Sequence, residues 1–347
     1  MTATGLSVHA LRPEDAGSWD EFVVKSDEST FFHLSCWKQV IEQAFGYATY
    51  YRIVKRGEAI TGILPLTHVK SRLFGNKLIS NAFAMYGGPV AQDDESRRAL
   101  EGEAERIMRV LRVPVLEFRN IKPHRSDWAT RSDLYATFRK PLFPTVPQNL
   151  KAIPPGQSKV IRNRATRNGL YSEVDQDIDR LYHIYSESVR NLGTPVYSKK
   201  YFNILKNLFP DNCHVLTVMH GKTPVASVMS VQFRKEIMTL YGGGTAAAPA
   251  LGANVFMYWE VMRLACERGC ELFDFGRSKL GTGAYAFKRN WGFEPTALAY
   301  QYKLANGWAI PDQNPLNPKY QPLIAAWKWL PLPVANLIGP PIAKAIG

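Results

Sequence analysis

The sequence has few cysteines, no long apolar run and fewer acidic than basic residues, and each shortage excludes a class of protein. Its four cysteines are Cys36, Cys213, Cys266 and Cys270. Cys266 and Cys270 lie one helical turn apart without a pair of histidines, so we expect no metal site and interpret all four as buried free thiols. No stretch reaches the roughly 20 apolar residues of a membrane-spanning helix. Because the first residues lack the charged-then-apolar pattern of a signal peptide, we expect a cytoplasmic protein, with a peripheral position at the inner membrane left open.

The shortage of acidic residues gives the chain a strong positive charge. There are 43 lysines and arginines against 30 acids, which gives a net charge of +13 and a pI of about 9.5. This excess favours a polyanionic partner such as nucleic acid, an anionic membrane face or a phosphate-bearing substrate, although a solvated basic surface is the plain alternative. The length of 347 residues and the hydrophobic content of 46% indicate two globular domains.

Two parts of the chain share one layout. The string "YYRIVKRGEAITGILPLTHVK" runs on to "SNAFAMYGGPVA", and "HVLTVMHGKTPVASVMSVQF" runs on to "IMTLYGGGTA". Each predicts two strands and a third strand that ends in Tyr-Gly-Gly, followed by a helix and another strand. The two triplets, 86–88 and 241–243, lie about 155 residues apart. A period of domain size predicts that one α+β fold has been duplicated.

The expected domain limits follow from this repeat. Each copy begins near an amphipathic helix, "SCWKQVIEQAFG" in the first and "DIDRLYHIYSESVRNLG" in the second. A proline-rich stretch, "RKPLFPTVPQNLKAIPPGQ", predicts a linker between them. We therefore expect an N-terminal domain at 1–147, a C-terminal domain at 148–310 and an apolar, proline-broken tail at 311–347. Tryptophans and lysines in the tail suit a membrane interface, and packing on the first domain is an equal alternative.

The layout resembles the acyltransferase fold of the GNAT superfamily. The resemblance implies two tandem GNAT-like domains, each a mixed, mainly antiparallel sheet flanked by helices. Members that use acetyl-CoA carry an Arg/Gln-x-x-Gly-x-Gly/Ala loop whose amides cradle the pyrophosphate. Here that place holds "GGGTAAAPALGAN", which lacks an Arg or Gln at the right offset.

A narrower resemblance rests on "GTPVYSKKYF", "FMYWEVMRLACERG", "FDFGRSK", "GAYAFKRNWGF" and "NPKY". These stretches resemble the Fem family of peptidyltransferases, in the FemAB-like branch associated with exopolysaccharide and PEP-CTERM/exosortase gene clusters. The resemblance is dense from about 151 to 305 and looser from 30 to 90. Fem enzymes move an amino acid from aminoacyl-tRNA to an amine of a peptidoglycan precursor. The resemblance thus implies a charged tRNA as co-substrate, an envelope precursor as acceptor and no tightly bound cofactor.

The candidate catalytic residues are Lys288, Phe287 and Asp274. When an amine attacks an ester or thioester, charge develops on the carbonyl oxygen, and a fixed cation stabilises it. Lys288 is placed to supply that cation, with Phe287 shaping the channel, and the resemblance implies the same role. A general base would need a desolvated amine, and an exposed helix lysine beside Arg289 is the plain alternative. Asp274 lies in an apolar strand and needs a partner, for which Arg277 is a candidate, or it orients the incoming amine.

Other residues are candidates for binding. Glycines at a strand end expose backbone amides, and the following helix start attracts anions, although a tight turn would also explain them. The fork of Arg277 matches phosphate or carboxylate. The basic run at 159–167 suits a tRNA acceptor end or a pyrophosphate, with a solvated basic face as the alternative. The substrate-binding candidates are Arg277, Tyr241, Gly242, Gly243, Tyr285, Lys38, Trp37 and Arg190. The anion- or tRNA-binding candidates are Lys159, Arg162, Arg164 and Arg167.

The sequence therefore favours an acyltransferase that moves an aminoacyl group onto an amine of an envelope or exopolysaccharide precursor. One alternative is a CoA-dependent N-acyltransferase acting on an amino sugar, against which the missing Arg or Gln counts. The other is a non-catalytic scaffold for envelope assembly. The expected partners are a charged tRNA or acyl-CoA donor, the acceptor, and a membrane surface through the tail.

Overall fold

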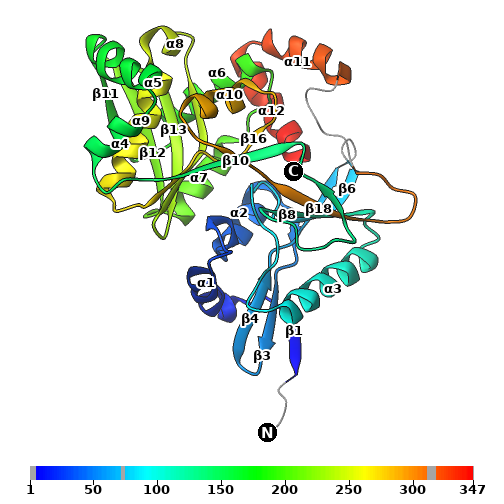
Figure 1. The fold of residues 1–347 in the computed structure, drawn as a ribbon. Coiled ribbons are helices and arrows are strands. Elements are labelled where there is room, and N and C mark those ends of the chain that lie inside the picture. Colours follow the sequence, from blue (N-terminus) through cyan, green and yellow to red (C-terminus); the bar gives the residue numbers. More distant parts are fainter. Residues whose placement is uncertain (1–4, 72–74, 311–317, 347) are drawn as a thin grey trace. The chain divides into compact units, whose positions relative to one another are not determined.

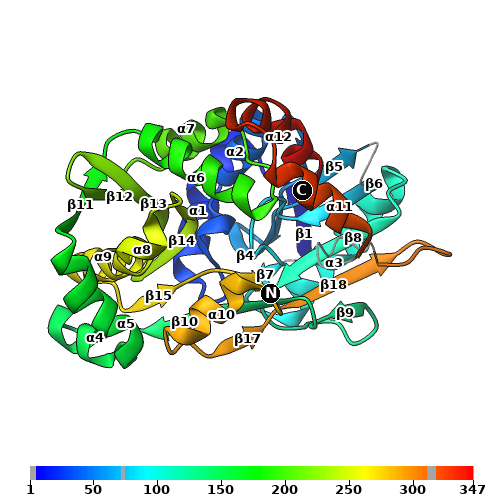
Figure 2. The ribbon, with the colours of Figure 1, turned by 90° about the horizontal axis from the view of Figure 1, so that it is seen from above.

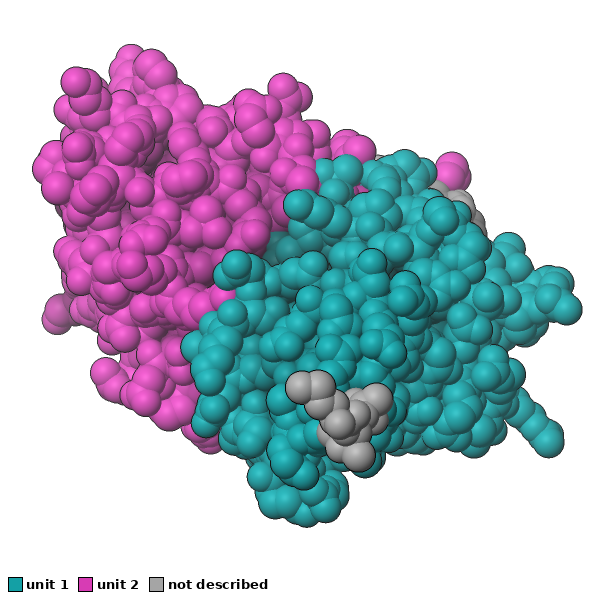
Figure 3. All heavy atoms as spheres, turned by 60° about the horizontal axis from the view of Figure 1, so that its bottom comes forward, with its two compact units in different colours: residues 1–134, 297–312, 344–347 teal, residues 135–296, 313–343 magenta. Residues whose placement is uncertain are grey.

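The computed structural model describes residues 5–71, 75–310 and 318–346, and the chain forms two compact units. Unit 1 contains residues 1–134, 297–312 and 344–347, and unit 2 contains residues 135–296 and 313–343 (Figure 3). These limits differ from the expected ones because of two strands. Strand β10 (Tyr135–Pro141) precedes residue 148 yet pairs within unit 2, and β18 (Ala299–Leu304) precedes residue 310 yet pairs within unit 1.

The described part of unit 1 is built from two sheets flanked by α-helices (Figure 1). The first sheet has the order β1-β3-β4-β7 and the second β2-β5-β6-β8-β18-β9. The strand bounds are β1 Leu6–Ala10, β2 Ala48–Thr49, β3 Arg52–Arg56, β4 Ala59–Leu64, β5 Thr67–Ser71, β6 Gly75–Ser80, β7 Val90–Ala91, β8 Val115–Asn120 and β9 Ala129–Arg131. The helices are α1 (Ala16–Lys25), α2 (Cys36–Phe45) and α3 (Asp94–Val110).

Helix α3 illustrates how the sequence builds the core of unit 1. Asp93 caps the helix by accepting a hydrogen bond from the backbone N–H of Ser96 at 2.7 Å. Leu100, Ala104 and Ile107 recur at helical spacing and are buried, and they belong to one hydrophobic cluster with residues of β6 and β8. The expected helix at 35–46 is also confirmed, since α2 covers most of it.

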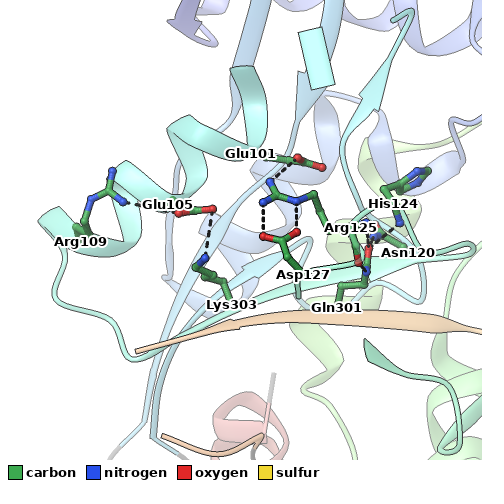
Figure 4. A network of polar contacts seen from close by, with 9 residues as sticks. All are labelled: Glu101, Glu105, Arg109, Asn120, His124, Arg125, Asp127, Gln301 and Lys303. Atoms are coloured by element: carbon green, nitrogen blue, oxygen red, sulfur yellow. Dashed lines mark hydrogen bonds and ion pairs between the residues drawn. The ribbon is translucent and has the colours of Figure 1, made fainter. Parts of the chain in front are cut away.

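Gln301 anchors β18 in unit 1, far along the chain from the other strands of that sheet. Its side chain is fully buried in the network shown in Figure 4. The Gln301 Oε1 atom accepts from the backbone N–H of His124 at 2.8 Å and from Asn120 Nδ2 at 3.1 Å. Its Nε2 atom donates to the Arg125 carbonyl at 2.6 Å and to the Thr130 hydroxyl at 3.0 Å. A buried amide satisfied on both sides fixes the register of β18.

Unit 2 is built on one mixed sheet with the order β11-β12-β13-β14-β15-β10-β16, and β17 pairs with β10 (Figure 2). Its other strands are β11 Leu170–Asp175, β12 Cys213–His220, β13 Thr223–Phe233, β14 Glu236–Gly244, β15 Leu272–Asp274, β16 Ser278–Lys279 and β17 Pro295–Ala297. Its helices before the tail are α4 Val146–Ala152, α5 Pro155–Lys159, α6 Asp179–Leu192, α7 Lys199–Leu208, α8 Ala248–Leu251, α9 Ala253–Glu267 and α10 Gly283–Asn290. The stretch expected to be a linker thus supplies β10 and α4.

Helices α6 and α9 cover opposite faces of this sheet (Figure 2). A Cβ atom on Gly242 of β14 would lie 3.4 Å from Met257 of α9. One on the next residue, Gly243, would lie 2.5 Å from the Cβ of Ser188 in α6. Successive strand residues point to opposite faces, so the two helices sandwich the strand.

The repeated Tyr-Gly-Gly triplets do not occupy equivalent places. Residues 241–243 lie within β14, whereas 86–88 lie in the loop after β6, so the prediction of a strand ending in this triplet was wrong for the first copy. Glu117 and Asp274 do correspond, since each is the third residue of a strand that pairs in parallel with β6 or β14. Glu117 pairs with Ile79, seven residues before Tyr86, whereas Asp274 pairs with Met238, three residues before Tyr241. Relative to the paired acids, the two triplets therefore differ in position by four residues.

The tail helices α11 (Gln321–Lys328) and α12 (Leu332–Ile346) pack on unit 2 through α6. The guanidinium of Arg190 donates to the carbonyls of Lys328 at 3.4 Å and Leu330 at 3.1 Å. Of these two helices, only residues 344–346 belong to unit 1, where the Tyr47 hydroxyl donates to the Lys344 carbonyl at 3.0 Å. Within the described ranges, no helix has both the length and the apolar character needed to cross a membrane.

Candidate active site

The short strand β15 pairs in parallel with only the first three residues of β14. The paired residues run from Glu236 with Leu272 to Met238 with Asp274, where β15 ends. Strand β14 continues to Gly244, and within the described part of unit 2 no strand pairs with its outer edge beyond residue 238. Alternate N–H and C=O groups of a strand point to each edge. The edge of β14 from 239 to 244 therefore offers backbone groups to a ligand.

Asp274 shapes the turn that follows β15. Its side chain is fully buried, and its Oδ1 atom accepts from the backbone N–H of Gly276 at 2.6 Å and from the Thr137 hydroxyl at 3.4 Å. Its Oδ2 atom lies 3.5 Å from Nε of Arg139. Arg277 is the partner that the sequence suggested, whereas Arg139 lies in the stretch predicted to be a linker. The Arg277 guanidinium is centred 4.3 Å from the ring centroid of Tyr135.

Lys288 holds the same turn from α10. Its side chain is only 8% exposed, and Nζ donates to the carbonyls of Phe275 at 2.6 Å, Gly276 at 2.9 Å and Arg277 at 3.3 Å. An ammonium has three N–H groups, so these carbonyls use all of them. Burial lowers the pKa of Lys288 to about 7, whereas three carbonyl acceptors favour the charged form. Lys288 is therefore neither an exposed helix lysine nor a cation with a donor to spare.

Aromatic rings fix α10 beside the turn. The ring of Phe275 lies 5.0 Å from that of Tyr258 in α9, and Phe287 lies 5.5 Å from the same tyrosine. Tyr285 packs edge-on against Phe138 of β10 at 5.2 Å. Phe287 and Tyr285 thus lie beside the residues that Asp274 and Lys288 organise.

Tyr241 of β14 belongs to a cluster of tyrosines. Its hydroxyl lies 2.7 Å from that of Tyr201, and its ring lies 5.6 Å from Tyr185 and 5.9 Å from Tyr197. Burial raises the pKa of Tyr241 and Tyr185 well above the usual range, so both phenols stay protonated. Tyr197 and Tyr201 belong to "GTPVYSKKYF", one of the stretches that carry the Fem-type resemblance, and are not among the predicted site residues.

Packing explains why glycines follow Tyr241. A Cβ on Gly243 would clash with Ser188 of α6, and one on Gly244 would lie 2.3 Å from Oδ1 of Asn254 in α9. Both helices therefore need a strand without side chains at this point. The prediction that Gly242 and Gly243 bind substrate stays untested, and their close packing adds a structural reason for them.

The basic run brings a cation to the start of α9. Its four basic side chains are exposed on α5, on the π-helix Val160–Ala165 and on the helical residues 166–167 that follow it. Helix α9 follows Gly252, which has φ +77°, and no side chain caps its first turn. A Cβ on Gly252 would lie 3.1 Å from Cδ of Arg164, so the arginine passes beside the helix start. Helix N-termini attract anions, and a guanidinium strengthens that attraction. Arg164 thus supplies, from another segment, a cation that the "GGGTAAAPALGAN" loop lacks.

Three other candidates have structural partners. Trp37 is fully buried, and its indole N–H donates to the Ala82 carbonyl at 3.4 Å. Lys38 forms an ion pair with Glu42 at 2.7 Å. Arg190 holds the tail carbonyls. Of the cysteines, Cys213 and Cys270 are buried as expected, while Cys36 and Cys266 are half-buried, and all four are free.

The corresponding place in unit 1 is filled by its own chain. The buried Arg119 side chain donates to Oε1 of Glu117 at 2.8 Å and to the Ala84 carbonyl at 2.9 Å. The backbone N–H of Gly87 donates to the Arg119 carbonyl at 3.1 Å, and Tyr86 is 1% exposed. The loop 81–89 therefore lies against the end of β8, and β6 stops at Ser80 where its counterpart β14 continues to Gly244.

The comparison with family models matches a segment of unit 2. Residues 158–289, which lie within unit 2, match a family model described as "Acetyltransferase (GNAT) domain". No curated protein matches the chain by sequence.

Among solved structures, the crystal structure of FemX has a TM-score of 0.66 at 12% identity and covers 86% of this chain and 98% of its own. L-PGS from Bacillus licheniformis has a TM-score of 0.56 at 13% identity, with 95% and 98% covered. A tandem GNAT protein from the clavulanic acid biosynthesis pathway has a TM-score of 0.54 at 12% identity, with 88% and 100% covered. At these identities the likeness shows the fold alone, and it confirms the expected tandem GNAT-like architecture.

Proposed function

We propose that this protein transfers an aminoacyl group from charged tRNA to an amine of an envelope or exopolysaccharide precursor. The observation that carries the proposal is the open edge of β14, which begins where β15 ends and leads toward the N-terminus of α9. The Fem-type sequence resemblance supports an aminoacyl donor, and the exopolysaccharide setting rests on that resemblance alone.

The chemistry proposed for this edge is a direct transfer. The lone pair of the acceptor amine attacks the ester carbonyl, so a C–N bond forms and charge develops on the carbonyl oxygen. Collapse of this intermediate breaks the ester C–O bond, and the ribose oxygen of the tRNA leaves with a proton given up by the amine. Backbone N–H groups of 239–244 would stabilise the oxyanion, since fixed donors aimed at developing charge lower the barrier.

Lys288 and Asp274 are proposed to act as positioning residues in this site. Lys288 holds the three carbonyls of 275–277, and Asp274 holds the N–H of Gly276, so the turn opposite the β14 edge is fixed from both sides. To polarise the substrate carbonyl, Lys288 would have to release one of these three carbonyls. Arg277, which follows the turn, remains the candidate for an anionic group of the substrate.

The donor phosphates are proposed to bind at the start of α9 beside Arg164. Charged tRNA and acyl-CoA both carry phosphates, so this feature alone does not separate them. The four exposed cations of 159–167 extend along a helical segment, which suits a longer polyanion. The missing Arg or Gln of the acetyl-CoA loop also favours tRNA.

Binding and transfer assays with each donor test the proposal. Radiolabelled aminoacyl-tRNA and acetyl-CoA are supplied separately, together with lipid-linked and nucleotide-linked sugar precursors that carry a free amine. We expect label transfer from aminoacyl-tRNA. Arg164→Ala should weaken donor binding by about tenfold, because a charge-assisted phosphate contact is lost. Arg109→Ala, which removes an exposed arginine from α3 of unit 1, is the matched control and should leave binding unchanged.

Transfer from acetyl-CoA alone would replace the proposal with the CoA-dependent alternative. If neither donor binds the folded protein, the result would favour the alternative of a non-catalytic scaffold for envelope assembly.

A further inference from the structure

Helix α12 buries small residues and exposes large apolar ones, which is the reverse of the usual arrangement. Its buried positions hold small residues, Ala335, Gly339 and Ala343, at a spacing of four. Its exposed positions hold larger ones, with Val334 41%, Leu337 77% and Ile338 39% exposed, at the spacing of one helix face. A surface helix of a soluble domain normally buries its large apolar side chains and exposes polar ones. Burial within the chain therefore does not explain this face.

Helix α11 adds two more exposed large apolar side chains. Leu323 is 70% exposed and Trp329, at the end of the helix, is 88% exposed. We call Leu323, Trp329, Val334, Leu337 and Ile338 the tail face. Large apolar side chains exposed singly are normal on proteins. Five of the 13 in the described chain, however, lie within residues 323–338, so they are concentrated in the two tail helices and the residues that join them.

The tail face is presented by packed helices. Arg190 holds the carbonyls of Lys328 and Leu330 between α11 and α12. A Cβ on Gly193 would lie 2.4 Å from Ile324, and one on Gly339 would lie 3.2 Å from the backbone of Val196. The helices thus contact unit 2 closely on one side while the apolar side chains remain exposed on the other.

The charge of the tail identifies the kind of partner. Residues 318–347 contain no aspartate or glutamate, and Lys328 and Lys344 are exposed. Tryptophan and leucine beside lysine, without acids, suit the boundary between anionic headgroups and acyl chains. Helices α11 and α12 have 8 and 15 residues, which is too short to span a bilayer, so they suit lying in the plane of its surface.

We propose that the tail face docks the protein on an anionic phospholipid bilayer. The residues of the tail face enter the interfacial region, and the flanking lysines contact the headgroups. This inference is independent of the transfer reaction, because it concerns where the protein binds and its test measures partition rather than activity.

Vesicle flotation with the full chain tests the inference. Vesicles of phosphatidylcholine alone are compared with vesicles that also contain phosphatidylglycerol. We expect the wild type to float with the anionic vesicles, less in high salt. The variant Leu323→Ser, Trp329→Ser, Leu337→Ser should lower the partition coefficient by about tenfold or more, since three apolar side chains no longer enter the interface.

The control removes the same number of exposed apolar side chains elsewhere, as Val24→Ser, Val110→Ser, Val174→Ser, which are 51%, 67% and 51% exposed. It should bind vesicles as the wild type does. Circular dichroism of both variants checks that they fold. Equal partition of the wild type and the tail variant, or no partition of the wild type, would overturn the inference. So would a wild-type dimer in light scattering that the tail variant loses, because the face would then join two copies.

Discussion

Replacing Lys288 with methionine is expected to lower the rate of transfer by about a hundredfold, because a displaced turn misaligns the reacting groups. Methionine fills a similar volume but donates no hydrogen bond. The carbonyls of Phe275, Gly276 and Arg277 would lose the donor that the ammonium provides. A buried acceptor left without a donor costs about 1–3 kcal/mol, so the turn should relax and move relative to β14.

Hydrogen exchange in the absence of substrate separates this positioning role from a cation that acts only in the transition state. Positioning predicts faster exchange of the backbone amides at 276–278 in Lys288→Met. A transition-state role predicts lost activity with exchange at the wild-type rate. Arg289→Met is the matched control, since it removes the adjacent exposed cation of the same helix and should change neither quantity.

Replacing Asp274 with alanine is expected to lower the free energy of unfolding by about 1–3 kcal/mol, because a buried hydrogen-bond acceptor is removed. The variant removes the acceptor of the Gly276 amide and one of the carboxylates beside Arg139. Asp274→Asn keeps an oxygen for the amide and should cost less. Urea denaturation followed by circular dichroism measures both. An alanine variant within the error of the wild type would show that the carboxylate does not stabilise the turn.

The contacts of Arg139 with Asp274 and Glu236 also predict that the stability of the fold depends on pH. Glu236 also contacts Arg139, and burial, together with the charge of Asp274, raises the pKa of Glu236 to about 7 from its ordinary value of 4.5. A carboxyl with a raised pKa in the folded state contributes stability that is present below 4.5 and lost as the pH rises through 7. The Asp274→Asn variant removes one cause of the shift, so its stability should vary less with pH in that window.

The sequence predicted the architecture well because its signals are local. Hairpins, amphipathic helices and the repeat of an acid in β8 and β15 can be read within short windows. Short windows could not predict that β10 pairs in the sheet of unit 2 and β18 in a sheet of unit 1. Both strands owe their places to contacts distant in sequence, such as Gln301 with Asn120 and Arg139 with Asp274. Prolines near β10 gave a misleading linker signal, since proline is tolerated at strand ends as well as in linkers.

The candidate site was only partly predictable for the same reason. The segment 273–288 was identified, but the partners of its polar residues were not. Nothing local shows that Lys288 donates to three main-chain carbonyls or that Arg164 passes beside Gly252. Conversely, Trp37 and Lys38 were chosen from a loose resemblance and have structural partners in unit 1.

Hydrogen exchange with and without aminoacyl-tRNA tests the central claim most directly, namely that the donor binds at the open edge of β14. The account predicts slower exchange in peptides covering 239–244, the start of α9 and 275–277, and no change in the loop 81–89 of unit 1. Arg164→Ala should reduce the protection at the start of α9. Bound tRNA that leaves the β14 edge exchanging at its original rate, or that protects unit 1 in its place, would contradict the account.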